Sequence, residues 1–364
     1  MDNFPGRKFL NIVLQRRTKV SLIRTYMYLM NAYNNVRYVP IRYCYPNLLS
    51  YPKFLSIFLT TRCNLRCTIC DRTNFKTSDM DFEDIYKLRN PIRHAKTIDL
   101  TGWGEAILYP QYEDVIKYIL SINNKKKLIY QTTNGTSDRY GDLLRGRLQG
   151  LVISLNAATP DTYEREMKGG NFEKTISSVK SLLSKLTEDD RKAVILHFVA
   201  HKNNYKELPK FIELAKSLHV TQVTIGHFLA NGSNTESNTV ICIQNDYNDI
   251  LEKVEEASKE LGIEVFYRKF GENYELSPKN CAYPYRSCFV MTDGEVTPCC
   301  SLGDKTFGNA FKNSFESVWF GKMLQMLRKS RNLPECSVCS VFQSFDKFET
   351  HLTPRYNQER FIKK

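Results

Sequence analysis

The chain has 364 residues, of which 42% are hydrophobic and 25% are charged, and its formal net charge is +13 at pH 7. These proportions are typical of a soluble globular protein with room for more than one domain. No apolar run approaches the roughly 18 residues that a membrane-spanning helix needs. The first residues lack the pattern of a signal peptide, so we expect a cytoplasmic protein.

Residues 1–52 predict a basic, helical N-terminal extension. Residues 1–50 hold eight basic side chains and one acidic side chain, which gives this segment a net charge of +7. Apolar and basic residues recur at roughly helical spacing in 9–14 and 22–30, as in amphipathic helices. We favour helices that pack on the following domain; the alternative is peripheral contact with a membrane surface. The charge also suits an anionic substrate, and a nucleic-acid partner is the less favoured interpretation.

A regular alternation of strands and helices begins near residue 51. Strands are expected at 53–59, 97–100, 127–131, 151–155, 194–199 and 222–225, with a further one at 263–267. Helices are expected at 82–88, 114–121, 141–147, 172–186, 206–218 and 247–261. This order predicts an α/β domain over 53–267, with a parallel sheet covered by helices. A linker over 268–280, a small cysteine-rich unit over 281–340 and a polar tail over 341–364 should follow.

Three cysteines, Cys63, Cys67 and Cys70, lie within eight residues directly after the first expected strand. A group of thiolates on such a loop indicates metal or iron–sulfur chemistry. A structural zinc site normally has four ligands, so three thiolates suggest a cluster with one iron left open. Most of the eleven cysteines fall into two groups, which argues against a disulfide framework in a long chain without a signal peptide.

The C-x3-C-x2-C spacing after a first strand resembles the radical S-adenosylmethionine superfamily. The resemblance implies a partial, TIM-like (β/α)6 barrel and a [4Fe-4S] cluster on Cys63, Cys67 and Cys70. It also implies that S-adenosylmethionine chelates the fourth iron and is reductively cleaved to a 5′-deoxyadenosyl radical, which abstracts a hydrogen atom from a substrate. The sequence departs from the family at Ile69, where an aromatic residue is common.

Functional groups in parallel βα folds gather at the carboxyl ends of the strands. After the second expected strand, Thr101-Gly102-Trp103-Gly104-Glu105 resembles the family's Gly-Gly-Glu motif, which implies that Gly102, Gly104 and Glu105 contact the amino end of S-adenosylmethionine. The other matching positions, all near later strand ends, are Asn134, Ser154, Asn156 and Lys168. The alternative is that these polar residues only form turns where strands end.

His197 and His227 lie near the ends of the fifth and sixth expected strands and are candidate catalytic groups. Either could give a proton to a substrate or take one from it, although a lone histidine at a strand end is more often structural. Cys288 is a third candidate, as a donor of a hydrogen atom to a substrate radical, and Cys300 could serve in the same way.

The second group of cysteines surrounds Asp293-Gly294, which predicts a hairpin, and a helix expected around 315–328. Their order resembles the auxiliary-cluster domains called SPASM and, in shortened form, twitch. The resemblance implies one auxiliary [4Fe-4S] cluster on Cys281, Cys299, Cys336 and Cys339, because no cysteine follows Cys339 to hold a second one. Cys300 could replace Cys299 as a ligand. A structural zinc ion is the rival interpretation, because ligand type alone does not separate the two.

These features predict an iron–sulfur oxidoreductase of the radical type. The expected reaction is oxidation or epimerisation of a carbohydrate-like or phosphorylated small molecule, with flavodoxin or ferredoxin as electron donor. No domain for peptide recognition is evident before the barrel, which favours a small molecule over the alternative of a peptide- or protein-modifying maturase. A zinc-stabilised protein that binds RNA or a membrane is the alternative of another class.

Overall fold

The computed structural model of the chain describes residues 50–70, 76–122, 128–228, 239–267, 269, 281–302, 305–330 and 333. The expected N-terminal extension up to residue 49, nearly all of the linker over 268–280, Cys336, Cys339 and the tail over 341–364 lie outside these residues. Within the described part, no helix combines the length and the apolar character that crossing a membrane requires.

A nine-stranded sheet organises the fold, in the order β11-β10-β1-β3-β4-β5-β7-β8-β9. From β10 to β9 every neighbouring pair is parallel. All seven expected strands are confirmed, with these bounds: β1 (Phe54–Ile57), β3 (Thr97–Asp99), β4 (Leu128–Thr133), β5 (Leu148–Ser154), β7 (Val194–Ala200), β8 (Gln222–His227) and β9 (Glu264–Phe266). The α/β architecture predicted from the sequence is therefore correct.

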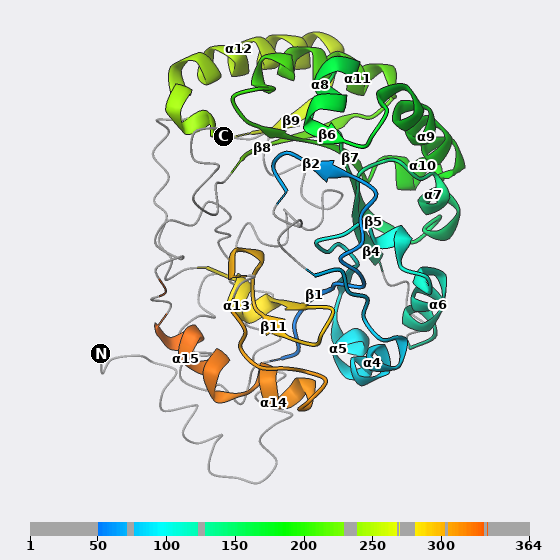
Figure 1. The fold of residues 1–364 in the computed structure, drawn as a ribbon, viewed down its shortest axis with the longest axis vertical. Coiled ribbons are helices and arrows are strands. Elements are labelled where there is room, and N and C mark those ends of the chain that lie inside the picture. The colour runs from blue at the N-terminus through cyan, green and yellow to red at the C-terminus, as the bar shows by residue number, and fades with distance from the viewer. Residues whose placement is uncertain are drawn as a thin grey trace, which may run out of the picture.

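Helices cover the outer side of this curved sheet (Figure 1). They are α4 (Phe82–Lys87), α5 (Arg89–His94), α6 (Tyr112–Ile122), α7 (Arg139–Leu143), α8 (Pro160–Glu166), α9 (Phe172–Lys185), α10 (Glu188–Arg191), α11 (Leu208–Ser217) and α12 (Gln244–Leu261). Short 3-10 turns lie at η4 (Ala106–Leu108), η5 (Tyr205–Glu207) and η7 (Val240–Ile243). The helix expected at 141–147 instead ends at Leu143, because the chain turns at Gly146, whose φ is +72°.

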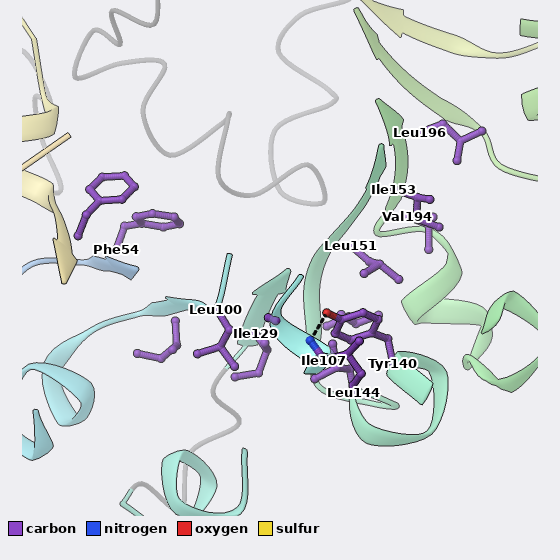
Figure 2. Close-up of a cluster of buried hydrophobic side chains, with 14 of the residues drawn as sticks. Phe54, Leu100, Ile107, Ile129, Tyr140, Leu144, Leu151, Ile153, Val194 and Leu196 are labelled. Carbon is purple, nitrogen blue, oxygen red and sulfur yellow. Dashed lines mark hydrogen bonds between the residues drawn. The ribbon is translucent and has the colours of Figure 1, made fainter. Parts of the chain in front are cut away.

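The outer face of the sheet forms the main apolar core. Figure 2 shows part of it, where Ile129, Leu151 and Ile153 of the strands pack with Tyr140 and Leu144 of the helical layer. Farther along the sheet, the ring of Phe198 on β7 meets that of Phe211 on α11 at 5.0 Å between centroids. Because side chains alternate along a strand, the residues between these positions face the opposite, concave side.

Aromatic rings fill the amino-terminal end of the concave side. The ring of Phe54 lies 6.3 Å from Tyr130 and 5.9 Å from Phe289, and Phe58 lies 6.3 Å from Phe289. Gly150 makes room for this plug, because a Cβ there would lie 2.7 Å from the Tyr130 ring. Aromatic packing thus fills part of the concave side.

The C-terminal unit is continuous with the barrel sheet. β10 (Ser287–Val290) pairs in parallel with β1, and β11 (Val296–Thr297) pairs with β10 in the expected hairpin, in which Gly294 has a φ of +85°. The other elements are α13 (Tyr283–Arg286), η9 (Cys300–Leu302), α14 (Phe315–Trp319) and α15 (Lys322–Ser330). The single helix expected around 315–328 is therefore two helices, which break at Phe320 and Gly321.

Candidate functional site

The loop that carries Cys63, Cys67 and Cys70 begins directly after β1 and is held from two sides. On one side, the Thr61 amide donates to the Ser78 carbonyl at 2.9 Å and the Thr60 hydroxyl donates to the Asp79 carboxylate at 2.6 Å. On the other, the Glu105 amide donates to the Arg62 carbonyl at 2.7 Å. The end of β3 therefore fixes the backbone that leads into Cys63.

The carboxylate of Glu105 faces the protein interior. It accepts hydrogen bonds from the Thr133 hydroxyl at 3.0 Å, the Asn134 amide at 2.8 Å and the Tyr140 hydroxyl at 2.5 Å. Burial raises the pKa of Glu105, and the three donors lower it in part. The side chain thus ties the loop after β3 to the end of β4 and to α7, and the contact of Glu105 with the cofactor stays a prediction.

Asn134 reaches the cysteine loop directly. Its side-chain amide lies 3.9 Å from the Cys63 sulfur and donates to the Asn64 side chain at 2.9 Å. The backbone amide of Leu65 also donates to the Cys63 sulfur, at 3.5 Å. N–H groups directed at a sulfur favour its thiolate form and tune a bound cluster.

Cys67 lies on a short strand, β2 (Arg66–Cys67), which pairs antiparallel with β6 (Met167–Lys168). Arg66 faces Lys168 across this ladder, so the expected cofactor-binding lysine lies beside the cysteine loop. The Cys70 amide donates to the Cys67 carbonyl at 3.1 Å, which closes a turn between the last two cysteines.

The three thiols fit an iron–sulfur cluster by their chemistry, since all are half-buried, soft donors on one loop with N–H groups aimed at Cys63. Across the described stretches, no three His, Cys, Asp or Glu side chains converge as metal ligands. The ligand assignment therefore stays a prediction from the spacing and the donor set.

A row of polar side chains crosses three neighbouring strands on the concave side. Ser154 of β5 lies beside His197 of β7, which lies beside Thr224 of β8. The His197 Nδ1 and the Thr224 hydroxyl are 2.7 Å apart. Gly226 leaves the space that the imidazole occupies, since a Cβ there would lie 3.2 Å from its Cε1. All three side chains of this polar row keep part of their surface exposed.

Asn156 and His227 hold structure together at nearby strand ends. Asn156 has a φ of +53°, and its side-chain oxygen accepts from the Val199 amide at 2.8 Å, which ties the end of β5 to β7. His227 packs edge-on against Tyr247 of α12 at 5.1 Å between ring centroids. The structure therefore places His197 on the concave side and His227 against the helical layer, so the two histidines do not share a site.

The described cysteines of the C-terminal unit separate into two environments. Cys281 and Cys299 are half-buried and Cys300 is exposed. Burial raises the pKa of Tyr283, and the negative charge of neighbouring cysteine thiolates raises it further, so all three cysteines lie near this phenol. Cys288 is instead fully buried in the middle of β10, where burial raises its pKa strongly. It has no exposed surface through which to donate a hydrogen atom.

Three residues around the site, Thr224, Tyr140 and Glu166, were not predicted from the sequence. Thr224 could have been found from strand alternation, because it shares a face with Gly226 and a register position with His197. Tyr140 and Glu166 could not, since each meets its partner across a long stretch of chain: Tyr140 bonds Glu105, and Glu166 bonds Thr68, which is 98 residues away.

Asp99 is a buried carboxyl group at the floor of this site and gives a testable pH dependence. It accepts from the Ser56 hydroxyl at 2.7 Å and from the Thr101 amide at 2.9 Å, but burial outweighs both and raises its pKa from 3.8 to about 6. The folded state thus holds this proton more tightly than the unfolded state. The contribution of Asp99 to stability is fully present below about pH 4 and is lost as the pH rises through about 6.

We expect Asp99→Asn to remove this pH dependence, because asparagine stays neutral while nearly filling the same volume. The free energy of unfolding of the variant, minus that of the unchanged protein, should rise by about 2 kcal/mol from pH 4 to pH 7. Urea denaturation of both metal-free proteins at several pH values measures this difference in the free energy of unfolding. A difference that stays constant over this range would contradict the assignment.

Comparison with known proteins identifies two domains in this chain. Residues 57–215 match the family model of the radical SAM superfamily, and residues 281–340 match SPASM, described as an iron–sulfur cluster-binding domain. The AdoMet-dependent heme synthase of Methanosarcina barkeri is 24% identical over 79% of this chain and 88% of its own. A tungsten-containing aldehyde ferredoxin oxidoreductase cofactor-modifying protein of Pyrococcus furiosus is 23% identical over 82% of this chain and 90% of its own.

Among solved structures, Streptococcus suis SuiB bound to S-adenosylmethionine has the same fold. Its TM-score is 0.61 at 16% identity, with 89% of this chain and 79% of that chain covered. The two domain matches identify S-adenosylmethionine and iron–sulfur clusters as the cofactors. The chain therefore combines a radical S-adenosylmethionine domain over residues 57–215 with a SPASM-type iron–sulfur domain over residues 281–340.

Proposed function

We propose that this chain is a radical S-adenosylmethionine oxidoreductase that oxidises a hydroxylated, carbohydrate-like small molecule. The polar row of Ser154, His197 and Thr224 carries the proposal. It lies on the side of the sheet that the helices leave uncovered, toward the strand ends that also hold the cysteine loop. Hydroxyl and imidazole groups in register suit a ligand with several hydroxyls, because each can both donate and accept a hydrogen bond.

The proposed cofactor residues lie on the loops that follow β1 and β3 and on the short ladder of β2 and β6. Cys63, Cys67 and Cys70 would hold the cluster, and the backbone of Gly102 and Gly104, with Lys168 beside the loop, would hold S-adenosylmethionine. The bound pair supplies one-electron cleavage of S-adenosylmethionine and, through the resulting 5′-deoxyadenosyl radical, removal of a hydrogen atom from the substrate. The aromatic rings packed along β1, β4 and β10 would limit the access of water to that part of the concave side.

His197 has the best-defined role among the protein's own side chains. Its Nδ1 is engaged with the Thr224 hydroxyl, which orients the ring beside Ser154 on the concave side of the sheet. An oriented imidazole can take the hydroxyl proton when an alcohol becomes a carbonyl. Burial of Cys288 in the sheet core argues against one of the two candidate hydrogen-atom donors for epimerisation, which leaves the exposed Cys300 as the other.

The C-terminal unit is proposed to accept the substrate's remaining electron. Cys281 and Cys299, with Cys336 and Cys339 outside the described residues, would hold the auxiliary cluster. This unit joins the sheet at β1, the strand that leads into the cysteine loop, which supports a short route between the two clusters. Flavodoxin or ferredoxin is the proposed reductant. The names of the two relatives above, a heme synthase and a cofactor-modifying protein, support a small-molecule substrate.

Anaerobic reconstitution with iron and sulfide tests this function. The reduced protein, given S-adenosylmethionine, should form 5′-deoxyadenosine, and a polyol or aminocyclitol panel should raise its rate. Deuterium at the reacting carbon should appear in the 5′-deoxyadenosine. A peptide library that stimulates turnover while the panel does not would support a maturase instead, and no 5′-deoxyadenosine at all would favour the zinc-stabilised alternative.

We expect His197→Gln to lower substrate-dependent turnover by about 10-fold or more, because a positioned hydrogen bond and a proton acceptor are both lost. Cleavage of S-adenosylmethionine without substrate should stay within about 3-fold of the unchanged protein. His219→Asn is the control, since His219 is exposed beyond α11 and its φ of +56° suits asparagine. Equal loss of both activities in His197→Gln would contradict a substrate-specific role.

A further inference from the structure

A buried carboxylate lies directly beneath the turn between the last two cysteines of the loop. Thr68, between Cys67 and Cys70, donates from its hydroxyl to the Glu166 carboxylate at 2.6 Å and from its amide to the Glu166 carbonyl at 2.9 Å. Thr68 is exposed whereas Glu166 is only 3% exposed. The end of α8 thus holds one residue of the cysteine loop through both its backbone and its side chain.

Glu166 keeps its charge in this buried position. The Arg165 Nε donates to its other oxygen at 2.9 Å, and the His201 Nε2 lies 3.3 Å from the oxygen that Thr68 binds. Burial alone would raise the pKa of Glu166, but the hydrogen bonds from Thr68 and Arg165, with the nearby His201, lower it overall. Burial lowers the pKa of His201. Glu166 is therefore a carboxylate, and its bond to Thr68 is a strong, charge-assisted one.

Behind His201, a single side chain connects Glu166 to the ends of two sheet strands. Asn204 accepts from the His201 amide at 2.8 Å and donates to the carbonyls of Asn156 and Val199, both at 3.0 Å. Asn204 is only 2% exposed. The buried groups Glu166, His201 and Asn204, which we name the carboxylate brace, therefore link the cysteine loop to the ends of β5 and β7.

We propose that Glu166 is a positioning residue for the cysteine loop, which it holds through Thr68 against the carboxylate brace. The two-residue β2–β6 ladder is a short connection, so the side-chain bond supplies much of the restraint on the turn from Cys67 to Cys70. Partners one shell behind metal ligands commonly change metal affinity by about 10- to 100-fold. The inference rests on the proposed function only in taking Cys67 and Cys70 as cluster ligands.

Four variants test the bond. Thr68→Val removes the hydroxyl at equal volume, Thr68→Ser restores it, and Glu166→Gln replaces one acceptor oxygen with a donor. Thr187→Val is the matched control, because Thr187 makes the same 2.6 Å bond to the Asp190 carboxylate at α10, far along the chain from the cysteines. Thermal melting of all four reports whether any change is global.

In reconstituted protein, we expect Thr68→Val and Glu166→Gln to release iron to a chelator about 10-fold faster and to alter the electron paramagnetic resonance spectrum of the reduced cluster with S-adenosylmethionine. Thr68→Ser and Thr187→Val should match the unchanged protein. The double variant Thr68→Val/Glu166→Gln should release iron no faster than either single variant, because each substitution removes the same hydrogen bond. Unchanged iron release and spectra in Thr68→Val, or a Thr68→Ser variant as impaired as Thr68→Val, would overturn the proposal.

Measurements on the metal-free protein distinguish a failure of this proposal from a failure of the proposed function. Thr68→Val should raise the rates at which iodoacetamide alkylates Cys67 and Cys70 several-fold and leave Cys63, which Asn134 holds, unchanged. Faster alkylation in a protein that never cleaves S-adenosylmethionine would support the brace and contradict the radical function. Equal alkylation rates at Cys67 and Cys70 in Thr68→Val and the unchanged protein would overturn the brace even in an active enzyme.

Discussion

Cys63→Ala is expected to abolish the formation of 5′-deoxyadenosine. Three thiolates leave one iron of a cluster open, and loss of one thiolate leaves too few protein ligands to retain it. The variant should also carry about four fewer iron atoms per chain after reconstitution, as one [4Fe-4S] cluster would be lost. The measurements are chromatography of the nucleoside product and iron analysis of the reconstituted protein.

Two further cysteine variants make this result interpretable. Cys242→Ala is the control, because Cys242 is exposed on η7 and belongs to neither group. Cys281→Ala should lose a similar amount of iron but still cleave S-adenosylmethionine, since its cluster is proposed to act after the radical has formed. If Cys63→Ala retained product formation, or if Cys281→Ala also abolished it, the division of labour between the two groups would be wrong.

The barrel was predictable because local patterns and the fold agree. Most strands contain a short stretch of apolar residues, and each long helix repeats apolar residues every three or four positions, so element type is visible in a window of about ten residues. The helix α9 shows how local the information is: Asn171 caps it by accepting from the Lys174 amide, and Phe172 to Leu183 supply its buried stripe. The order of such elements then limited the possible architectures.

The details of the site were not predictable because they depend on contacts between distant residues. The position of β10 beside β1 joins residues more than 230 apart, so the C-terminal unit was expected as a separate body although its hairpin extends the barrel sheet. The same contact buries Cys288, which spacing alone made a candidate donor. His197 and His227 looked equivalent in sequence, and only the alternation of β7 and β8 against the helices separates them.

Gly104 shows most clearly how the structure changes the meaning of a motif. In sequence, the glycines of Gly102-Trp103-Gly104-Glu105 suggest a backbone that a ligand approaches closely. In the structure, a Cβ on Gly104 would collide with the Arg62 carbonyl oxygen and would lie 2.7 Å from the Thr60 carbonyl oxygen and 2.8 Å from the Thr61 carbonyl carbon. What approaches Gly104 is thus the protein's own backbone, one to three residues before Cys63.

We therefore expect Gly104→Ala to destabilise the metal-free protein by about 3 kcal/mol and to lower cluster content, because backbone atoms cannot yield as a flexible side chain can. Moving the backbone of Gly104 away from residues 60–62 would also break the hydrogen bond from the Glu105 amide to the Arg62 carbonyl. Gly102→Ala is the matched variant: its Cβ would lie 3.2 Å from the Phe58 ring, which can move, so the cost should stay within about 1 kcal/mol.

Urea denaturation of both glycine variants without metal, followed by iron analysis after reconstitution, distinguishes the two interpretations of the motif. If Gly104 mainly gives a ligand access, Gly104→Ala should fold with unchanged stability and full iron but bind S-adenosylmethionine poorly. If it mainly seats the cysteine loop, stability and iron should fall before any ligand is added. The second outcome is expected, because the atoms that crowd Gly104 belong to residues 60–62, which lead directly into Cys63.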